Sequence, residues 1–403
     1  MDQIRVGVVG ASPERGWAAA AHIPALRTLP AYELTAVGTS RPESAREAAR
    51  AFGAAHAFTD ARRLAEHPEV DLVVVTVKVA AHAELVGAAL AAGKHVYCEW
   101  PLGLTTAEAE RLAAAARAAG VHDAVGLQAR YAPAITYARE LIAGGHLGRV
   151  TAVNVHAARS KGASGEIPTW AAYTLDPAQG AGLLEVVGGH TLDTLEYLAG
   201  DLTELSAALS VSRPRYTVAE TGATVEATSP DQVVLHGRLA GGAVAAVHLQ
   251  DAKVGESRTV LEFTGTEGDL TVVAAGDWRA AQIQVGEPRL YEARKAGDPW
   301  RDLPVPAGHG RIPDLTSTPG AGGAPVRVPG EAPARGTGGA SVDLPGETPV
   351  LARNVARLYA RLAEDIREGT RRVPGFEHGV RVHRLLDAVR RSAETGGSRP
   401  VER

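Results

Sequence analysis

The sequence predicts an α/β protein with an N-terminal doubly wound parallel sheet and a C-terminal α+β domain built on a large, open, mostly antiparallel sheet. Two observations lead to this prediction. Over residues 1–127, short Val-rich runs alternate with helical stretches, as in sheets whose parallel strands are joined by helices. Over residues 128–403, strand-like runs follow one another with few helices between them, which is typical of an antiparallel sheet.

The first forty residues have the pattern of a βαβ unit. An apolar run at 4–9 predicts a strand, a Gly-rich turn covers 10–16, a helical pattern begins near Trp17, and 34–38 predicts a second strand. In a Rossmann domain such a turn lets the backbone approach a dinucleotide pyrophosphate, and the helix N-terminus offers free N–H groups. The last glycine of the usual fingerprint lies one residue late, and a strand–turn–helix without a ligand is the alternative. Cofactor contacts are expected from Gly10, Ala11, Ser12 (through its hydroxyl and N–H), Gly16 and Trp17.

The rest of the N-terminal domain continues the alternation. Thr105 is expected to cap a helix, and Gly93 and Gly120 follow helices as C-terminal glycines commonly do. The expected helices cover residues 42–52, 81–92 and 107–119, and the expected strands cover residues 71–77, 95–99 and 123–128.

The second domain begins with a helix at 132–143 and a strand at 149–156, and a later helix carries His190. Further strands are expected at 205–211, 231–239, 243–250, 260–264, 270–273 and 281–285. The Gly- and Pro-rich stretch 308–346 is predicted to be a mobile surface loop, with a lid over the pocket as the alternative. Two helical stripes follow, at 351–366 and 380–389, and the tail from Glu394 is expected to fray. We expect the sheet to join copies into a homodimer or homotetramer.

The composition is that of a globular protein, with 45% hydrophobic and 22% charged residues among 403. The net charge of -4 gives no general attraction to nucleic acid or to an anionic membrane. The single cysteine, Cys98, excludes an internal disulfide framework and suits a reducing compartment. The sequence has neither the layout of a signal peptide nor a long uncharged apolar run. We therefore expect a cytoplasmic protein with no nucleic-acid or membrane partner.

No metal site is expected from the histidines. The residues considered are scattered, without the spacing of a closed zinc site: His22, His82, His95, His156 and His190. A serine hydrolase is not expected either, because no Gly-x-Ser-x-Gly turn follows a predicted strand.

Three motifs resemble one known family: the strand at 5–8, the stretch AAGKHVYCEWPL at 91–102, and GHTLD at 189–193. They are similar to the glucose–fructose oxidoreductase, inositol dehydrogenase and MocA family (Gfo/Idh/MocA), and the resemblance runs from Ile4 to about Ala393. It implies a Rossmann domain, an open-sheet C-terminal domain, and hydride transfer between a nicotinamide cofactor and a hydroxyl or keto carbon of a sugar, cyclitol or glycosylated molecule. Within the family, the chain most resembles the branch that contains the NAD(P)-binding repressor of the galactose regulon and its bacterial relatives. A catalytically silent sensor that acts through a protein partner is therefore the alternative.

Two members of the family's usual catalytic trio are replaced. Trp100 stands where these dehydrogenases have the lysine of Glu-Lys-Pro, and Val186 stands where they have an aspartate four residues before the catalytic histidine. His190 remains and is expected to be the general acid or base, with a packing role as the alternative. Asp193 is expected to orient His190, with a structural ion pair as the alternative.

Lys78 lies at the carboxyl edge of the predicted parallel sheet, where it is expected to supply the cation that Trp100 removed. Its alternatives are a cofactor contact and a solvent-exposed side chain. Trp100, Trp170 and Tyr173 are expected to contact the substrate, with the core as the alternative for the last two. Arg159 and Lys161 lie upstream, where the family's substrate loop enters.

Cofactor choice depends on the end of the second strand, where NAD enzymes place an acid for the ribose 2′-hydroxyl. Here Thr39, Ser40 and Arg41 offer hydroxyls and a guanidinium, which suit a 2′-phosphate. We therefore expect NADP(H), with NAD(H) as the alternative. Glu99 matches the family position near the nicotinamide ribose and carboxamide, with a plain ion pair as the alternative. The other expected cofactor contacts are Thr76, Val77, Lys78, His82, Trp100 (as an aromatic wall), Pro101 and Gln128.

Overall fold

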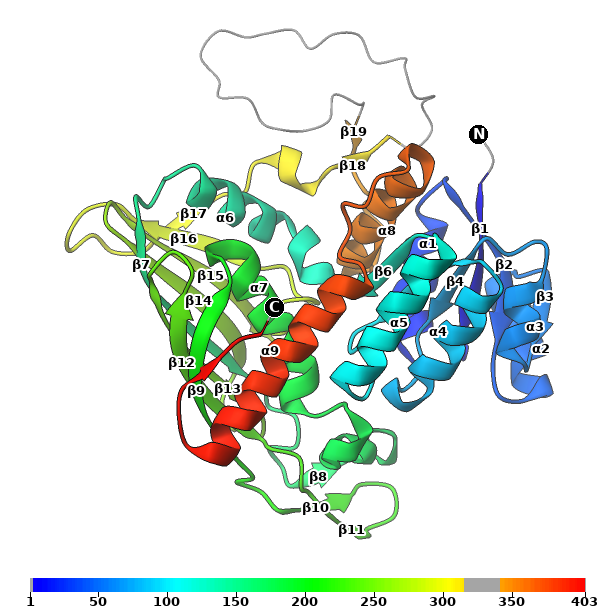
Figure 1. Ribbon diagram of the computed structural model, residues 1–403, viewed down its shortest axis with the longest axis horizontal. Coiled ribbons are helices and arrows are strands. Elements are labelled where there is room, and N and C mark those ends of the chain that lie inside the picture. Colours follow the sequence, from blue (N-terminus) through cyan, green and yellow to red (C-terminus); the bar gives the residue numbers. More distant parts are fainter. Residues whose placement is uncertain (1–2, 315–340, 403) are drawn as a thin grey trace, which may run out of the picture.

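The computed structural model describes residues 3–314 and 341–402. A parallel sheet with helices on its faces forms one side of the molecule, and a large curved sheet forms the other (Figure 1). Helices α8 and α9 run between them in the picture. None of the helices in these residues is both long enough and apolar enough to traverse a lipid bilayer.

The N-terminal sheet has six parallel strands in the order β3-β2-β1-β4-β5-β6. The strands are β1 (Ile4–Val9), β2 (Tyr32–Gly38), β3 (His56–Phe58), β4 (Leu72–Val75), β5 (His95–Glu99) and β6 (Asp123–Gly126). This order confirms the predicted doubly wound sheet, and it places the crevice that binds ligands in such sheets at the carboxyl ends of β1 and β4.

Five α-helices, one π-helical turn and one 3₁₀ turn connect these strands: η1 (Ala18–His22), α1 (Ile23–Arg27), α2 (Pro42–Phe52), α3 (Ala61–Glu66), η2 (Val79–Ala81), α4 (His82–Ala91) and α5 (Thr106–Ala119). The predicted cap of α5 is present, because Thr105 accepts a hydrogen bond from the Glu108 N–H at 3.2 Å. Gly120 ends this helix in the left-handed conformation. The short β3 and α3 are elements that the sequence pattern did not predict.

The C-terminal sheet has nine strands in the order β17-β16-β15-β14-β7-β13-β12-β9-β20. Their bounds are β7 (Val150–Ala158), β9 (Leu202–Ser210), β12 (Gln232–Leu239), β13 (Val244–Gln250), β14 (Ser257–Gly265), β15 (Asp269–Gly276), β16 (Arg289–Ala293), β17 (Arg301–Leu303) and β20 (Arg399–Pro400). Only β7 and β13 pair in parallel within it, which confirms a mostly antiparallel sheet. Val234 on β12 and Val244 on β13 are 47% and 51% exposed. The expected assembly of copies through this sheet stays a prediction.

Two sequence-based predictions for this domain are wrong. Residues 281–285 form buried turns rather than a strand, so the apolar run there reflects burial and not strand pairing. The tail does not fray at Glu394, because the helix continues to Thr395 and β20 then adds an edge strand to β9. The N–H of Val401 also donates to the Thr203 carbonyl at 3.0 Å.

Smaller elements surround the large sheet. Strands β8 (Glu166–Ile167), β10 (Arg215–Val218) and β11 (Thr224–Glu226) form a separate three-stranded sheet. Most of the predicted loop at 308–346 lies outside the described residues. Its described ends are joined, because β18 (Ile312–Pro313) pairs with β19 (Ser341–Val342).

The remaining long helices are α6 (Pro133–Ala143), α7 (Gly189–Ala199), α8 (Val350–Glu368) and α9 (Phe376–Thr395). The apolar face of α8 shares one core with β1 and α1 of the N-terminal domain, and the Tyr32 hydroxyl donates to the Tyr359 carbonyl at 2.8 Å. Helix α9 packs against α5 and β9. The predicted domain boundary between residues 127 and 128 stays a prediction. Helix α8 lies after this boundary in the sequence but packs in the core of the N-terminal domain.

Candidate functional site

The turn after β1 has two glycines in the left-handed region, Gly10 at φ +97° and Gly16 at φ +102°. A Cβ at Gly10 would lie 2.8 Å from the Val77 side chain and 2.9 Å from the Thr76 hydroxyl, so the loop after β4 requires glycine there. Nothing lies within 4 Å of a Cβ at Gly16, which faces open space. The turn therefore leaves room for a ligand near Gly16.

Donors in this turn are only partly satisfied by the protein. The Ser12 N–H donates to the Gly10 carbonyl at 3.0 Å, so Ser12 offers its hydroxyl but not its N–H, which corrects half of the expectation for this residue. Ala11 is buried. The indole N–H of Trp17, at the start of η1, is buried without a partner in the described structure. Trp17 follows the open Gly16 in the chain, so its unpaired indole N–H is a candidate donor to the phosphate group of a dinucleotide.

The end of β2 leads directly into α2. The Thr39 hydroxyl is 2.6 Å from the Ser44 hydroxyl and donates to the Arg41 carbonyl at 3.1 Å, so it serves the turn itself. Ser40 and Arg41 are exposed, and within residues 3–314 and 341–402 the Arg41 guanidinium has no ion-pair partner. A free guanidinium at this position is available to an anion.

The loop after β4 is held in place by two side chains. The Thr76 hydroxyl donates to the Val9 carbonyl at 2.9 Å. His82 is buried, with Nδ1 2.8 Å from the Pro101 carbonyl and Nε2 3.0 Å from the Val77 carbonyl. Burial lowers the pKa of His82 below its usual value. His82 was expected to contact the cofactor, but it instead joins the loop after β4 to the segment after β5.

Lys78 and Tyr173 meet at the mouth of this crevice. The Lys78 Nζ lies 4.1 Å from the centroid of the Tyr173 ring, a cation–π contact. Tyr173 belongs to a short 3₁₀ helix, η4 (Thr169–Leu175), and burial raises its pKa. Trp170, on the same helix, is 48% exposed, so it is not a core residue. The structure thus brings together Lys78 and Tyr173, which the sequence analysis had singled out separately.

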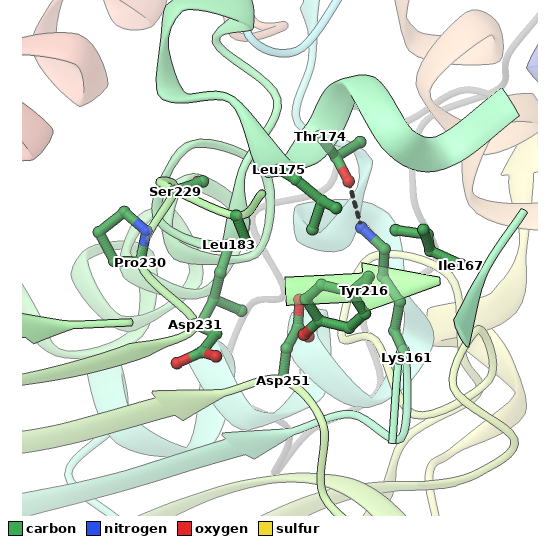
Figure 2. Close-up of a pocket in the computed structure, with 12 residues that line it drawn as sticks. Lys161, Ile167, Thr174, Leu175, Leu183, Tyr216, Ser229, Pro230, Asp231 and Asp251 are labelled. Carbon is green, nitrogen blue, oxygen red and sulfur yellow. Dashed lines mark hydrogen bonds between the residues drawn. The ribbon is translucent and has the colours of Figure 1, made fainter. Parts of the chain in front are cut away.

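A small cavity of about 20 Å³ lies beneath η4 (Figure 2). The Lys161 Nζ donates to the Thr174 hydroxyl at 2.7 Å, and burial together with Arg159 lowers the pKa of Lys161 to about 8. Arg159 itself forms two 2.7 Å bonds to the Asp251 carboxylate. The cavity has room for one water molecule and not for a sugar. What this region contributes to the site is the Lys161–Thr174 hydrogen bond, which fixes the helix that carries Tyr173.

Glu99 ends β5 and is part of a chain of hydrogen bonds. Its Oε1 is 3.0 Å from Nε2 of His22, and Nδ1 of His22 is 2.7 Å from the Tyr359 hydroxyl. His22 is fully buried, and a Cβ at Gly126 would lie only 2.6 Å from the Glu99 Oε1. The carboxylate is therefore positioned by residues from η1 and α8. The sequence analysis did not find this chain, since no local pattern links residues 337 positions apart.

Trp100 has a structural role that differs from the expected one. It is 5% exposed, its indole N–H donates to the Glu185 carbonyl at 2.8 Å, and its ring contacts His383 of α9 at 4.8 Å. Gly189 at the start of α7 has no Cβ, and one there would clash with the indole. The expectation of an aromatic wall that stacks on nicotinamide or a sugar ring is therefore wrong, because the indole is buried. Trp100 instead packs α7 and α9 onto the end of β5.

His190 follows Gly189 and is held near the carboxyl end of β5 by this packing. It is 4% exposed, and its Nδ1 has no partner among the described residues. Burial lowers the pKa of His190 to about 4, and the Glu99 carboxylate opposes this shift by raising it. His190 is therefore neutral at pH 7 and can accept a proton.

Asp193 is committed to other partners. Its carboxylate receives two bonds from Arg130, at 2.9 and 2.6 Å, and lies 2.6 Å from Nε2 of His378. Asp193 is 1% exposed, and the Arg130 cation and these bonds hold its pKa well below the usual range despite burial. The structure shows the ion pair, which was the alternative for this residue, and no hydrogen bond to His190.

Gln128 lies at the start of a short 3₁₀ helix, η3 (Gln128–Tyr131), after β6. It is 2% exposed, and its Oε1 has no partner in the described residues. Its expected contact with the cofactor stays a prediction.

Comparison with known proteins identifies the family. Residues 4–127 match a model described as an oxidoreductase family with an NAD-binding Rossmann fold, GFO_IDH_MocA. A 1,5-anhydro-D-fructose reductase from Ensifer adhaerens is 32% identical over 308 residues, which is 72% of this chain and 86% of that protein. The chain belongs to the Gfo/Idh/MocA oxidoreductase family.

Two further likenesses connect this Gfo/Idh/MocA member to the branch expected from the sequence. Residues 133–274 match the model of the Gal80p C-terminal domain. The galactose/lactose metabolism regulatory protein GAL80 of Saccharomyces cerevisiae is 29% identical over 301 residues, or 70% of this chain and 68% of that protein. In structure, an oxidoreductase domain protein from Kribbella flavida has a TM-score of 0.78 at 27% identity, with both chains covered completely. The branch therefore includes a regulator as well as oxidoreductases.

Proposed function

We propose that the protein transfers hydride between NADP(H) and a hydroxyl or keto carbon of a sugar, cyclitol or related glycosylated molecule. The observation that carries this proposal is His190, a buried and neutral imidazole with an unpaired ring nitrogen beside the carboxyl end of β5. The relationship to a sugar-derivative reductase supports the class of substrate.

The nicotinamide ring, when bound, supplies the hydride acceptor. In the direction of oxidation, His190 would take the proton of the substrate hydroxyl, so that no net charge would be left on the oxygen of the carbonyl product. Lys78 supplies a cation at the crevice, where it stabilises negative charge that develops on the oxygen. Glu99, whose carboxylate contacts His22, lies at the carboxyl end of β5.

The first experiment identifies the nucleotide that denatured protein releases, and its redox state before and after incubation with sugars and cyclitols. We expect NADP(H) that changes redox state with at least one compound. With that compound, His190→Asn is expected to lower kcat by about 10²- to 10⁴-fold and to leave the Kd for NADPH within twofold. His248→Asn is the control, since its Nε2 bonds Gln232 on the C-terminal sheet. Unchanged turnover in His190→Asn would remove His190 from the mechanism.

Cofactor preference is tested at Arg41. Because its guanidinium has no ion-pair partner in the described residues, Arg41→Ala is expected to raise the Kd for NADP(H) about tenfold and to leave the Kd for NAD(H) within twofold. Arg46→Ala is the matched control: Arg46 lies on α2, the helix that Arg41 directly precedes, is exposed and pairs with Glu43 at 3.4 Å. Equal effects of the two substitutions on NADP(H) would contradict a 2′-phosphate contact at Arg41.

A regulatory function is the second candidate, and the match of residues 133–274 to the Gal80p C-terminal domain favours it. Trp100 fits it too, because a buried indole occupies the place of the family's catalytic lysine. In that case the released nucleotide would not change redox state with any compound, although NADP(H) would still bind. That pair of results would replace the proposed enzyme by a nucleotide sensor that acts on a protein partner.

A further inference from the structure

Three metal-ligating side chains meet at the amino ends of β3 and β4. They are His56 at the start of β3, His67 directly after α3, and Glu69 in the turn before β4. One imidazole nitrogen of each histidine and one carboxylate oxygen lie within 4.8 Å of one another. The two imidazole rings are 4.1 Å apart between centroids, and His56 Nε2 is 2.5 Å from Glu69 Oε2.

The backbone that carries His67 and Glu69 is fixed by its neighbours. Thr35 on β2 donates to the Glu69 carbonyl at 2.7 Å. Lys94 donates to the carbonyls of His67 and Val70, at 3.3 and 2.7 Å. Val70 is fully buried, and its N–H bonds the His67 carbonyl at 3.1 Å. Only the ligating side chains have to move to close around an ion.

We propose that His56, His67 and Glu69 form a binding site for a divalent transition-metal ion of the zinc class. Two imidazoles and one carboxylate are the donors that zinc, cobalt, nickel and copper accept, whereas magnesium and calcium take oxygen donors. Three protein ligands leave a fourth position for water. The ion replaces two existing hydrogen bonds, the one between His56 and Glu69 and the one from the Glu69 N–H to His67 Nδ1.

The site is separate from the proposed cofactor site. In the pairing of β2 with β3, His56 lies opposite Ala36, and Phe58 lies opposite Gly38 at the carboxyl end. Glu69 precedes β4 and so also lies at its amino end. Metal binding is therefore expected to leave the affinity for NADPH unchanged. The prediction of no metal site from sequence considered five other histidines and neither His56 nor His67.

The test uses the full chain after removal of metal with a chelator. Zn²⁺ is titrated by calorimetry, and Co²⁺ is titrated by its visible absorption, which is strong only in tetrahedral sites. We expect one Zn²⁺ per chain, a tetrahedral Co²⁺ spectrum, and a Tm that rises with Zn²⁺. His67→Ala and Glu69→Gln are expected to weaken Zn²⁺ binding at least tenfold. His248→Ala, which removes a partly exposed imidazole elsewhere, is the control.

Four results would overturn the proposal: no Zn²⁺ binding to the wild-type chain, an affinity in His67→Ala equal to that of wild type, an equal loss in His248→Ala, or competition between Zn²⁺ and NADPH. Thermal unfolding of each metal-free variant is measured in parallel. A variant that unfolds at the wild-type Tm and fails to bind Zn²⁺ shows loss of the ligand itself, which supports the site. These readouts do not depend on turnover.

Discussion

Asp193 is hydrogen-bonded to Arg130 and His378 inside the protein. We therefore expect loss of its carboxylate to lower the free energy of unfolding more than it lowers turnover. Asp193→Asn leaves the Arg130 guanidinium, which is 18% exposed, without its carboxylate. Breaking a buried pair on one side costs about 3–5 kcal/mol, because the remaining charge stays desolvated. The free energy of unfolding in urea is the measurement.

The control for Asp193 is Asp302→Asn, which breaks an Arg–Asp pair of the same 2.6 Å length. In that pair Arg289 and Asp302 are 66% and 50% exposed, so solvent screens the interaction and a loss below about 1 kcal/mol is expected. Similar losses in the free energy of unfolding of the two variants would mean that burial of Asp193 does not strengthen its ion pair.

Which residues could be proposed for the site depends on how local their signals are. His190, Lys78 and Arg41 were singled out because a sheet edge or a short motif marks each of them, and their roles stay predictions. The role of Trp100 was predicted wrongly, because its position after β5 does not reveal that Gly189 makes room for the indole. The link from Glu99 through His22 to Tyr359 is tertiary and has no counterpart in the local sequence.

At the scale of elements, the contact between α7 and β5 depends on a missing methyl group. Gly189→Ala would place a Cβ against the Trp100 indole, which fills a well-packed interface. We expect a loss of about 1–3 kcal/mol in the free energy of unfolding from overpacking, and a lower kcat because His190 is adjacent. Thermal unfolding and turnover are measured together.

Gly87→Ala in α4 provides the matched control, since nothing lies within 4 Å of a Cβ there. Alanine in an uncrowded helical position is expected to stabilise the protein by roughly 0.5–1 kcal/mol. If both substitutions changed stability by the same amount and sign, packing against Trp100 would not be the reason for glycine at position 189.

Elements were predictable where capping and periodicity agree. The predicted bounds of α2 and β5 coincide with those observed, and α5 differs by one residue at its start. The apolar residues at 281–285 were misassigned because buried turns and strands share the same composition. β20 was missed because two residues give no periodicity, and their pairing depends on where α9 ends.

For the whole molecule, buried neutral histidines determine the response to acid. Burial lowers the pKa of His95, His190 and His383 to about 4 each, whereas an unfolded histidine titrates near 6.5. Between about pH 6.5 and pH 4 the unfolded chain therefore binds protons that the folded protein excludes, and stability falls as the pH falls. Burial also raises the pKa of Glu196 to about 7 and raises the pKa values of Asp123 and Glu364, which acts in the opposite direction. The histidines outnumber them, because burial also lowers the pKa values of His82, His122, His156 and His309.

The urea midpoint is expected to fall steadily from pH 6.5 to pH 4. The fall corresponds to a loss of roughly a few kcal/mol in the free energy of unfolding. His383→Gln is expected to flatten this dependence, because it removes one of the titrating histidines. A midpoint that stayed constant or rose on acidification would contradict the assignment.

The packing of α8 has a consequence for how the protein is made. Its residues Val355, Leu358 and Leu362 lie in the same core as Val6 and Val8 of the first strand, although synthesis separates them by some 350 residues. During synthesis, the N-terminal domain emerges from the ribosome long before α8. Until α8 is made, the apolar surface around Tyr32 stays exposed to solvent. Chains that stall before α8 is synthesised therefore expose this apolar surface on an otherwise folded domain. We expect chaperones that bind such surfaces to determine how much native protein accumulates.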